Sequence, residues 1–223
     1  STLFPYTTLF RSTINNNDPL VTVIIPTYNR RTHVEETLLS VINQTYRNLE
    51  IIVVNDAGED IIDLIRSLND SRIKYFIHKS NKGLAGSRNT GLNNATGDYI
   101  AFLDDDDIFY PNHIELLLKE ITSCDYNVVY SDAYRCLQEF NGQKYITVKK
   151  ELKYSLEYSQ QFLFALNIAP VQCFLFHKSC LSDNIRFDES LTTYEDWEFW
   201  VKLSLKNDFK HIPQVTSEYR HRN

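Results

Sequence analysis

The sequence predicts an α/β fold, a single domain in which helices cover both faces of a mostly parallel β-sheet. From about residue 20 onward, short apolar runs rich in β-branched residues alternate with segments of helical pattern. The runs are apolar throughout, which is typical of strands buried on both faces. Polar residues also gather just after several of the runs, and an open α/β sheet binds its ligands at the carboxyl ends of its strands.

The first half of the chain is expected to hold four strands and three helices. Pro26 follows the first apolar run and is expected to break that strand, and Thr32 with Glu35 fits a capping box that opens the first helix. The expected strands are residues 21–25, 49–54, 73–77 and 99–103. The expected helices are residues 32–44, 61–68 and 85–95.

The second half has a less regular pattern. Pro111 suits the first turn of a helix that continues through residues 115–121. Asn141-Gly142 predicts the turn of a polar, two-stranded segment at residues 134–150. Further elements are expected as a strand at 128–130, a helix at 159–166, a strand at 172–176 and a helix at 195–206.

The composition is that of a packed globular protein. Of 223 residues, 43% are hydrophobic and 13% aromatic, so a disordered chain is excluded. The formal charge of −6 argues against a broad basic face, and we expect no nucleic-acid partner. The four cysteines form no CxxC pair, which predicts free thiols in a reducing compartment.

The two ends of the chain differ from the rest. The sequence contains no methionine, and its opening STLFPYTTLFRS carries no periodic pattern. We expect residues 1–18 to be non-native or disordered, and the folded domain to occupy residues 19–223. The last residues show no pattern that would end a domain, so we also expect the chain to be truncated at its C-terminal end.

Four consecutive aspartates, residues 104–107, follow the fourth apolar run. Like charges at this spacing repel one another and raise each other's pKa. A divalent cation would offset the repulsion, and carboxylate oxygens suit Mg²⁺ or Mn²⁺, with a phosphate as the natural partner of such an ion. The alternative is a solvated acidic turn in which Asp107 caps the helix that begins near Pro111.

Six short motifs occur in a fixed order along the chain. They are Val23-Ile-Ile-Pro-Thr-Tyr-Asn-Arg30, Val53-Val-Asn-Asp56, Asn81-Lys-Gly83, Ser87-Arg-Asn89, Phe102-Leu-Asp-Asp-Asp-Asp107 and Glu195-Asp-Trp197. Together they resemble a family 2 glycosyltransferase with the Rossmann-like A-type fold of nucleotide-diphospho-sugar transferases. The resemblance covers roughly residues 20–220, and it implies an inverting transferase that uses a nucleotide-sugar donor and a divalent metal.

The resemblance implies a division of labour among the acidic residues. Asp106 would be the ligand of Mn²⁺ or Mg²⁺ in a DxD-type motif, and Asp104 and Asp105 would face the ribose, the donor sugar or metal-bound water. Asp56 would bind a uracil-type base. The alternative for Asp56 is a turn-forming role before Ala57. The nucleotide-binding half would be residues 19–107 and the acceptor-side half residues 108–223.

Pro26, Thr27, Tyr28 and Asn29 form the loop after the first strand, and the resemblance assigns them to the donor. Tyr28 could stack on the nucleobase while the loop backbone bonds the edge of the base. The alternative is a plain strand terminator, because proline cannot donate to a sheet.

Lys82, Gly83 and Arg88 are the remaining residues that the resemblance assigns to the donor. A guanidinium fork suits phosphate, which places Arg88 near the base or the diphosphate. The alternatives are a surface arginine and a loop shaped by Gly83.

The resemblance places the general base in the pair Glu195–Asp196. On a helix, Glu195 shares a face with Glu198 and Lys202, which predicts a solvated polar stripe with an i,i+4 ion pair. Asp196 lies on the side of Phe199, where partial desolvation raises a carboxyl pKa toward that of a useful base. We therefore assign Asp196 as the base.

Capping offers another account of the same segment, because Thr192 with Glu195 and Thr193 with Asp196 both fit a capping box. It explains Glu195 better than Asp196.

The expected reaction moves a sugar from a UDP-linked donor to the hydroxyl of a glycan or lipid-linked acceptor, in the synthesis of cell-surface polysaccharide. The location expected from the family is the cytoplasm, with peripheral association at the inner face of the membrane. One alternative is a degenerate, non-catalytic protein that binds nucleotide-sugar. A receiver domain is another, but it needs an acidic pair after the first strand, where this chain has Pro-Thr-Tyr-Asn.

Overall fold

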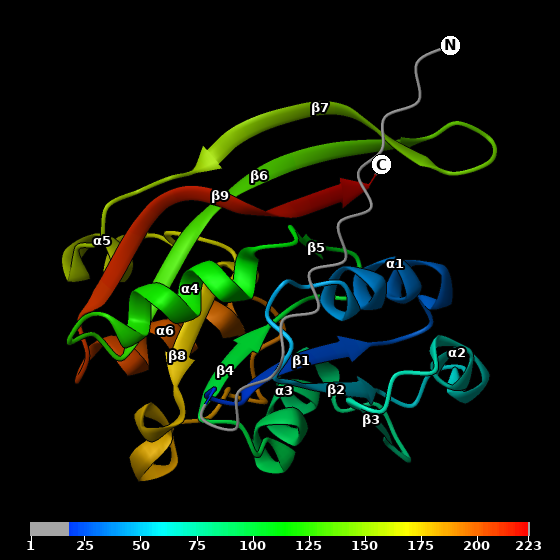
Figure 1. Cartoon of the computed structure of the whole chain (residues 1–223), viewed down its shortest axis with the longest axis horizontal. Coiled ribbons are helices and arrows are strands. Elements are labelled where there is room, and N and C mark those ends of the chain that lie inside the picture. The colour runs from blue at the N-terminus through cyan, green and yellow to red at the C-terminus, as the bar shows by residue number, and fades with distance from the viewer. Residues whose placement is uncertain (1–17, 223) are drawn as a thin grey trace.

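A computed structural model describes residues 18–222 of the protein. The segment expected to be non-native or disordered, residues 1–18, lies outside the described residues except for Asp18. Within residues 18–222 the strands form one nine-stranded sheet in the order β3-β2-β1-β4-β8-β6-β9-β5, with β7 beside β6 (Figure 1). The predicted α/β class is confirmed.

Four parallel strands form the first half of the sheet. They are β1 (Val21–Thr27), β2 (Leu49–Asn55), β3 (Ile73–Ile77) and β4 (Tyr99–Phe102). Every residue of β1 and β2 is buried, which agrees with their continuous apolar runs. The sequence indicated each of these strands to within a few residues. The clearest pattern belongs to β1 and β2, which are buried throughout, whereas the edge strand β3 is only partly buried.

Helices cover both faces of this sheet. Val23 and Ile25 of β1 face one hydrophobic cluster, and Ile24 between them faces the other. The first cluster is covered by α1 (Arg31–Ile42), α2 (Ile62–Leu68) and α4 (His113–Thr122). The second is covered by α3 (Gly83–Asn94), α5 (Gln160–Ala165) and α6 (Glu195–Ser204). Helix α3 approaches β1 closely, since a Cβ on Gly91 would lie 2.3 Å from Cγ2 of Ile24.

The second half of the sheet is mixed. A 3-10 turn (Val171–Cys173) leads into β8 (Phe174–His177), which is antiparallel to both β4 and β6. Strands β6 (Val128–Phe140), β7 (Tyr145–Tyr154) and β9 (Phe209–Arg222) form a long arm that arches over α1 and the short β5 (Ile108–Phe109) (Figure 1). A further 3-10 segment spans Lys178–Asn184.

The hairpin predicted at Asn141-Gly142 is confirmed at the tip of this arm. The backbone N–H of Asn141 donates to the carbonyl of Lys144 at 3.1 Å, and Gly142 has a φ of +92°. Strand β6 joins the strand predicted at residues 128–130 to the predicted segment 134–150, β7 continues past that segment to Tyr154, and β9 was not predicted.

Pro26 does not end the first strand. Strand β1 continues to Thr27, which pairs with Asn55 of β2. The register with β4 on the other side stops at Ile24, so the missing N–H of Pro26 interrupts no pairing with β4.

The capping box predicted for the first helix is wrong, and so is the capping alternative for the segment around Glu195. Helix α1 begins at Arg31, so Thr32 lies inside its first turn, and the N-cap residue Arg30 makes no side-chain cap. The N-cap of α6 is Tyr194 with a left-handed φ of +61°, which leaves Thr192 and Thr193 outside the helix.

The helices of residues 18–222 include none long and apolar enough to cross a membrane.

Candidate active site

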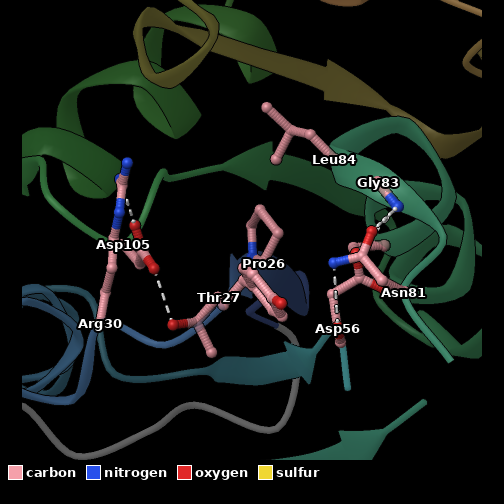
Figure 2. Close-up of a pocket in the computed structure, with 10 residues that line it drawn as sticks. Pro26, Thr27, Arg30, Asp56, Asn81, Gly83, Leu84 and Asp105 are labelled. Carbon is pink, nitrogen blue, oxygen red and sulfur yellow. Dashed lines mark hydrogen bonds and ion pairs between the residues drawn. The ribbon is translucent and has the colours of Figure 1, made fainter. Parts of the chain in front are cut away.

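A pocket of about 300 Å³ opens at the carboxyl ends of β1 and β2 (Figure 2). Asp56 lies at one end, and Arg30 with Asp105 lies at the other, with Pro26 and Thr27 between them. The lining residues are Pro26, Thr27, Tyr28, Arg30, Asp56, Asn81, Gly83, Leu84, Ser87 and Asp105. The pocket therefore contains residues from five of the six sequence motifs, of which the motif at residues 87–89 contributes Ser87.

Asp56 organises the first turn of α3. Its buried carboxylate accepts hydrogen bonds from the backbone N–H groups of Lys82 and Gly83, each at 2.8 Å, and lies 2.7 Å from Nδ1 of His78. These bonds satisfy donors that a helix N-terminus leaves free. Lys82 and Gly83 thus act here through their backbone, and Gly83 has a φ of +76°.

The residues after β1 divide between the pocket and a neighbouring loop. Thr27 Oγ1 donates to Oδ2 of Asp105 at 2.7 Å, and Tyr28 lines the pocket with 48% of its surface exposed. Asn29 instead turns toward the loop after β2, where its Oδ1 accepts from the backbone N–H of Glu59 at 2.8 Å. Asn29 is not among the lining residues of the pocket.

The aspartate cluster splits into different environments. Asp105 is buried, and burial raises its pKa to about 6 even though the Thr27 hydroxyl and the Arg30 guanidinium favour its charged form. Asp106 keeps 26% of its side chain exposed and lies 3.0 Å from Nη1 of Arg30 and 3.5 Å from Nη1 of Arg222. Burial raises the pKa of Asp106 as well, and the two arginines oppose that rise.

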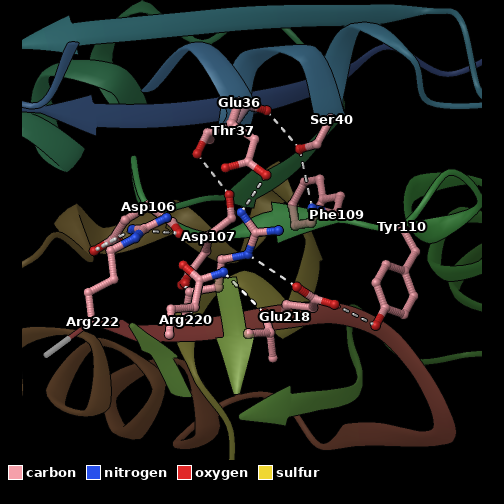
Figure 3. Close-up of polar contacts among 12 residues, drawn as sticks. Glu36, Thr37, Ser40, Asp106, Asp107, Phe109, Tyr110, Glu218, Arg220 and Arg222 are labelled. Atoms are coloured by element: carbon pink, nitrogen blue, oxygen red, sulfur yellow. Dashed lines mark hydrogen bonds and ion pairs between the residues drawn. The ribbon is translucent and has the colours of Figure 1, made fainter. Parts of the chain in front are cut away.

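Asp107 is tied to the last strand and to α1 (Figure 3). Its Oδ1 accepts from the backbone N–H of Arg220 at 2.7 Å, and its own carbonyl accepts from Oγ1 of Thr37 at 2.8 Å. Burial sets its pKa well above the usual range, and its Oδ2 has no hydrogen-bond partner among the described residues. The prediction that Asp107 caps the following helix is wrong, because β9 takes the carboxylate and the N-cap of α4 is Asn112.

One buried guanidinium joins the aspartate cluster to α6. Arg88, 1% exposed, donates from Nη2 to Asp104 and from Nη1 to Glu195, both at 2.7 Å. The surface alternative for Arg88 is therefore excluded, and its fork holds two carboxylates. The prediction that Glu195 belongs to a solvated stripe is wrong, because this ion pair buries it to 7% exposure. The stripe is real one turn later, where Glu198 pairs with Lys202 at 2.6 Å.

Asp196 lies beside this ion pair, at the start of α6. Its Oδ1 accepts from the backbone N–H of Trp197 at 2.7 Å, and its Oδ2 accepts from Nδ2 of Asn167 at 3.2 Å. Burial raises the pKa of Asp196, the charge of Arg88 opposes the rise, and the charge of Glu195 adds to it. The direction of the shift is the one expected from the sequence, whereas the partner Asn167 was not foreseen.

The site suits a metal that is shared with a ligand. Within residues 18–222, no group of three or more His, Cys, Asp or Glu side chains could hold an ion on its own. Mg²⁺ in nucleotide sites takes one or two carboxylates and completes its shell with phosphate oxygens and water. Asp106, part-exposed beside the pocket residue Asp105, fits that mode.

The sequence profile of glycosyl transferase family 2 matches residues 22–184. The chain belongs to glycosyltransferase family 2. It is 33% identical over 201 residues to the uncharacterised glycosyltransferase YwdF of Bacillus subtilis, covering 89% of this chain and 73% of that protein. It is 34% identical over 215 residues to the uncharacterised glycosyltransferase RC0461 of Rickettsia conorii, covering 92% of this chain and only 33% of that protein.

The fold also matches solved structures of the A-type transferase expected from the sequence. S. aureus TarS 1–349, in complex with UDP, superposes with a TM-score of 0.73 at 21% identity, covering 90% of this chain and 60% of that one. The same TarS fragment in complex with UDP-GlcNAc also gives a TM-score of 0.73. The chain thus spans between a third and three quarters of the length of these relatives.

Proposed function

We propose that this chain carries the catalytic site of an inverting glycosyltransferase that moves a sugar from a UDP-linked donor to an acceptor hydroxyl. The observation that carries the proposal is the bridge from Asp104 through Arg88 to Glu195, because it holds the aspartate cluster next to Asp196. The donor class is supported by S. aureus TarS, which shares the fold and whose structures hold UDP and UDP-GlcNAc.

The geometry of the pocket suggests how the donor lies. The nucleobase would occupy the end formed by Asp56 and Tyr28, and the diphosphate would lie toward Asp105 and Asp106. A Mn²⁺ or Mg²⁺ ion held by Asp106 would neutralise the diphosphate and stabilise its departure.

Asp196 acts on the acceptor. It takes the proton of the attacking hydroxyl, whose oxygen forms a bond to the anomeric carbon from the face opposite the diphosphate. The bond from that carbon to the diphosphate oxygen breaks, so UDP leaves and the configuration inverts. A pKa raised by burial makes the Asp196 carboxylate a stronger base than an exposed aspartate.

The wider role follows from family membership alone. We propose an acceptor that is a glycan or a lipid-linked precursor of cell-surface polysaccharide, modified in the cytoplasm at the inner face of the membrane. Cell fractionation tests the peripheral association. We expect the protein in the membrane fraction at low salt and its release by a high-salt wash. A protein found in the supernatant at every salt concentration contradicts the association.

The reaction is tested by turnover and donor hydrolysis with a panel of nucleotide sugars, in Mn²⁺ and in EDTA. We expect UDP release only with metal, and Asp196→Asn to lower turnover about 10²- to 10⁴-fold, the usual effect of a general base. Glu198→Gln, on the same helix and paired with Lys202, is the matched control and should keep turnover.

Each part of the proposal has its own contrary outcome. Turnover that survives complete metal removal rejects the role of Asp106 as a metal ligand, and normal turnover of Asp196→Asn rejects the base. Donor binding with neither transfer nor hydrolysis would identify a non-catalytic nucleotide-sugar-binding protein.

A further inference from the structure

The guanidinium of Arg30 binds the Asp106 carboxylate, which is the ligand proposed for the metal. Arg30 stands between β1 and α1, and its Nη1 donates to Oδ1 of Asp105 at 3.1 Å (Figure 2) and to Oδ2 of Asp106 at 3.0 Å. We propose that Arg30 is an exchangeable counter-ion: it neutralises Asp106 in the donor-free protein and moves to the donor diphosphate when a divalent cation takes its place. This inference rests on the proposed function, because it assumes the metal at Asp106 and a diphosphate in the pocket.

The exchange follows from charge. A guanidinium and a divalent cation are both positive, so they compete for the same carboxylate oxygen and repel each other when held side by side. Oδ2 of Asp106 is shared by Arg30 and by Arg222, which lies 3.5 Å away. A metal that binds this oxygen therefore competes with the Arg30 guanidinium, which donates to it at 3.0 Å.

Of the two arginines, Arg30 is the one able to leave. Its side chain is 52% exposed, whereas that of Arg222 is 11% exposed. Arg222 also donates to the carbonyl of Asp106 at 3.2 Å and lies over the ring of Tyr145, 5.3 Å from its centroid. Among residues 18–222, the side-chain bonds that Arg30 would give up are those to Asp105 and Asp106.

The pocket offers Arg30 a second position. It is the one cationic side chain among the lining residues that the structure describes, and two other lining residues, Asp105 beside it and Asp56 at the far end, are acidic. A diphosphate entering this pocket needs a positive partner, and a guanidinium fork binds two phosphate oxygens at once. Arg30 released from Asp106 supplies that partner without a change in the backbone.

The consequence is coupled binding of metal and donor. A metal that binds alone must expel Arg30 into solvent, and a donor that binds alone must draw Arg30 away from two carboxylates. When both bind, each exchange completes the other, so each ligand should tighten the other by the same factor.

Calorimetric titration tests this with Mn²⁺ alone, UDP alone, and each in the presence of the other. In the native chain we expect UDP to tighten Mn²⁺ binding by about 10-fold or more. Arg30→Gln should tighten Mn²⁺ alone by about 3- to 10-fold, because the competitor is gone, and weaken UDP alone by a similar factor. The coupling factor should fall accordingly.

Arg31→Gln is the matched control, since Arg31 pairs with exposed Asp63 at 2.6 Å and does not line the pocket. It should bind both ligands as the native chain does, and thermal melting should show that both variants fold. Unchanged Mn²⁺ affinity and unchanged coupling in Arg30→Gln would overturn the exchange and leave the proposed function standing. A native chain that binds neither UDP nor Mn²⁺ would overturn both.

Discussion

At the amino ends of the strands, the carboxylate of Glu50 on β2 is buried among donors, whereas at the carboxyl ends Asp105 is buried beside other carboxylates. Glu50 accepts hydrogen bonds from Thr22, Lys74 and both the backbone and hydroxyl of Thr96. Burial alone would raise the pKa of Glu50, but these donors outweigh it and lower the pKa to about 2.

The same burial has the opposite outcome at Asp105, whose pKa rises to about 6. Glu50 joins β1, β2 and β3 to the segment before β4, so its charge stabilises the sheet. Asp105 gains less from its partners, and its charge costs free energy. The carboxylate at the amino ends of the strands therefore stabilises the fold. The carboxylate at the carboxyl ends has a perturbed pKa, which is typical of a ligand-binding site.

The largest effect should come from Arg88→Met, which removes the cation that joins the two acidic groups of the carboxyl edge. Asp104 would lose its partner, and buried Glu195 would be left uncompensated. We expect the free energy of unfolding to fall by about 3–5 kcal/mol, measured by urea denaturation. A fall below about 1 kcal/mol would show that solvent or a shift of α6 replaces the bridge.

Glu50→Gln should have the next largest effect, confined to stability. The amide keeps the volume but loses the charge-assisted bonds, so the unfolding free energy should fall by about 2–3 kcal/mol. UDP affinity, measured by calorimetry on the folded variant, should stay at the native value because Glu50 lies at the opposite edge of the sheet. A tenfold loss of UDP affinity would contradict the separation of the two edges.

The pH dependence of stability distinguishes the two carboxylates. The raised pKa of Asp105 contributes stability that is fully present below about pH 4 and is lost as the pH rises through about 6. The lowered pKa of Glu50 contributes stability that is present above about pH 4.5 and is lost as the pH falls through about 2.

Unfolding in EDTA should therefore show the chain gaining stability between pH 7 and pH 5. Asp105→Asn should reduce that gain by about 1 kcal/mol, whereas Glu50→Gln should leave it unchanged. An equal gain in the native chain and in Asp105→Asn would mean that Asp105 is already neutral at pH 7 or that its pKa is that of an ordinary aspartate.

The smallest effect should be a displaced pH profile. The charge of Glu195 raises the pKa of Asp196, and its removal also leaves the opposing charge of Arg88 less compensated. Glu195→Gln should therefore move the acid limb of kcat/KM to lower pH, by about one unit or less. An acid limb that stays in place would indicate that another group is the base.

A second contrast, between the first four strands and the long arm, explains which elements the sequence could predict. Strands β1 and β2 are buried throughout and β4 is buried except at Tyr99, so their continuous apolar runs were recognisable, whereas the edge strand β3 is only partly buried. The arm formed by β6, β7 and β9 lacks that signal, because β7 is largely exposed, the pairing of β6 with β7 and β9 shifts register, and β9 contains Pro213. Its length follows from pairing between distant strands, which no local pattern encodes.

The candidate site was predictable in its positions and less so in its partners. The residues that follow β1, β2 and β4 meet at the pocket because parallel strands end at one edge. The hydrogen-bond partners of the carboxylates come from elsewhere: Asn167 donates to Asp196, and the backbone N–H of Arg220 donates to Asp107. A backbone N–H is present at nearly every residue, so it leaves no trace in composition.

The hydrogen bond from Arg220 to Asp107 bears on when the candidate site can form during synthesis of the chain. The two residues are separated by 113 positions, and the donor lies on β9, the last strand of the sheet in chain order. During synthesis, the parallel strands β1 to β4 can associate long before residue 220 leaves the ribosome, yet the aspartate loop still lacks this contact. A nascent chain would therefore be able to pair β1 to β4 before the bond to Asp107 forms, and a chain without β9 would lack this contact.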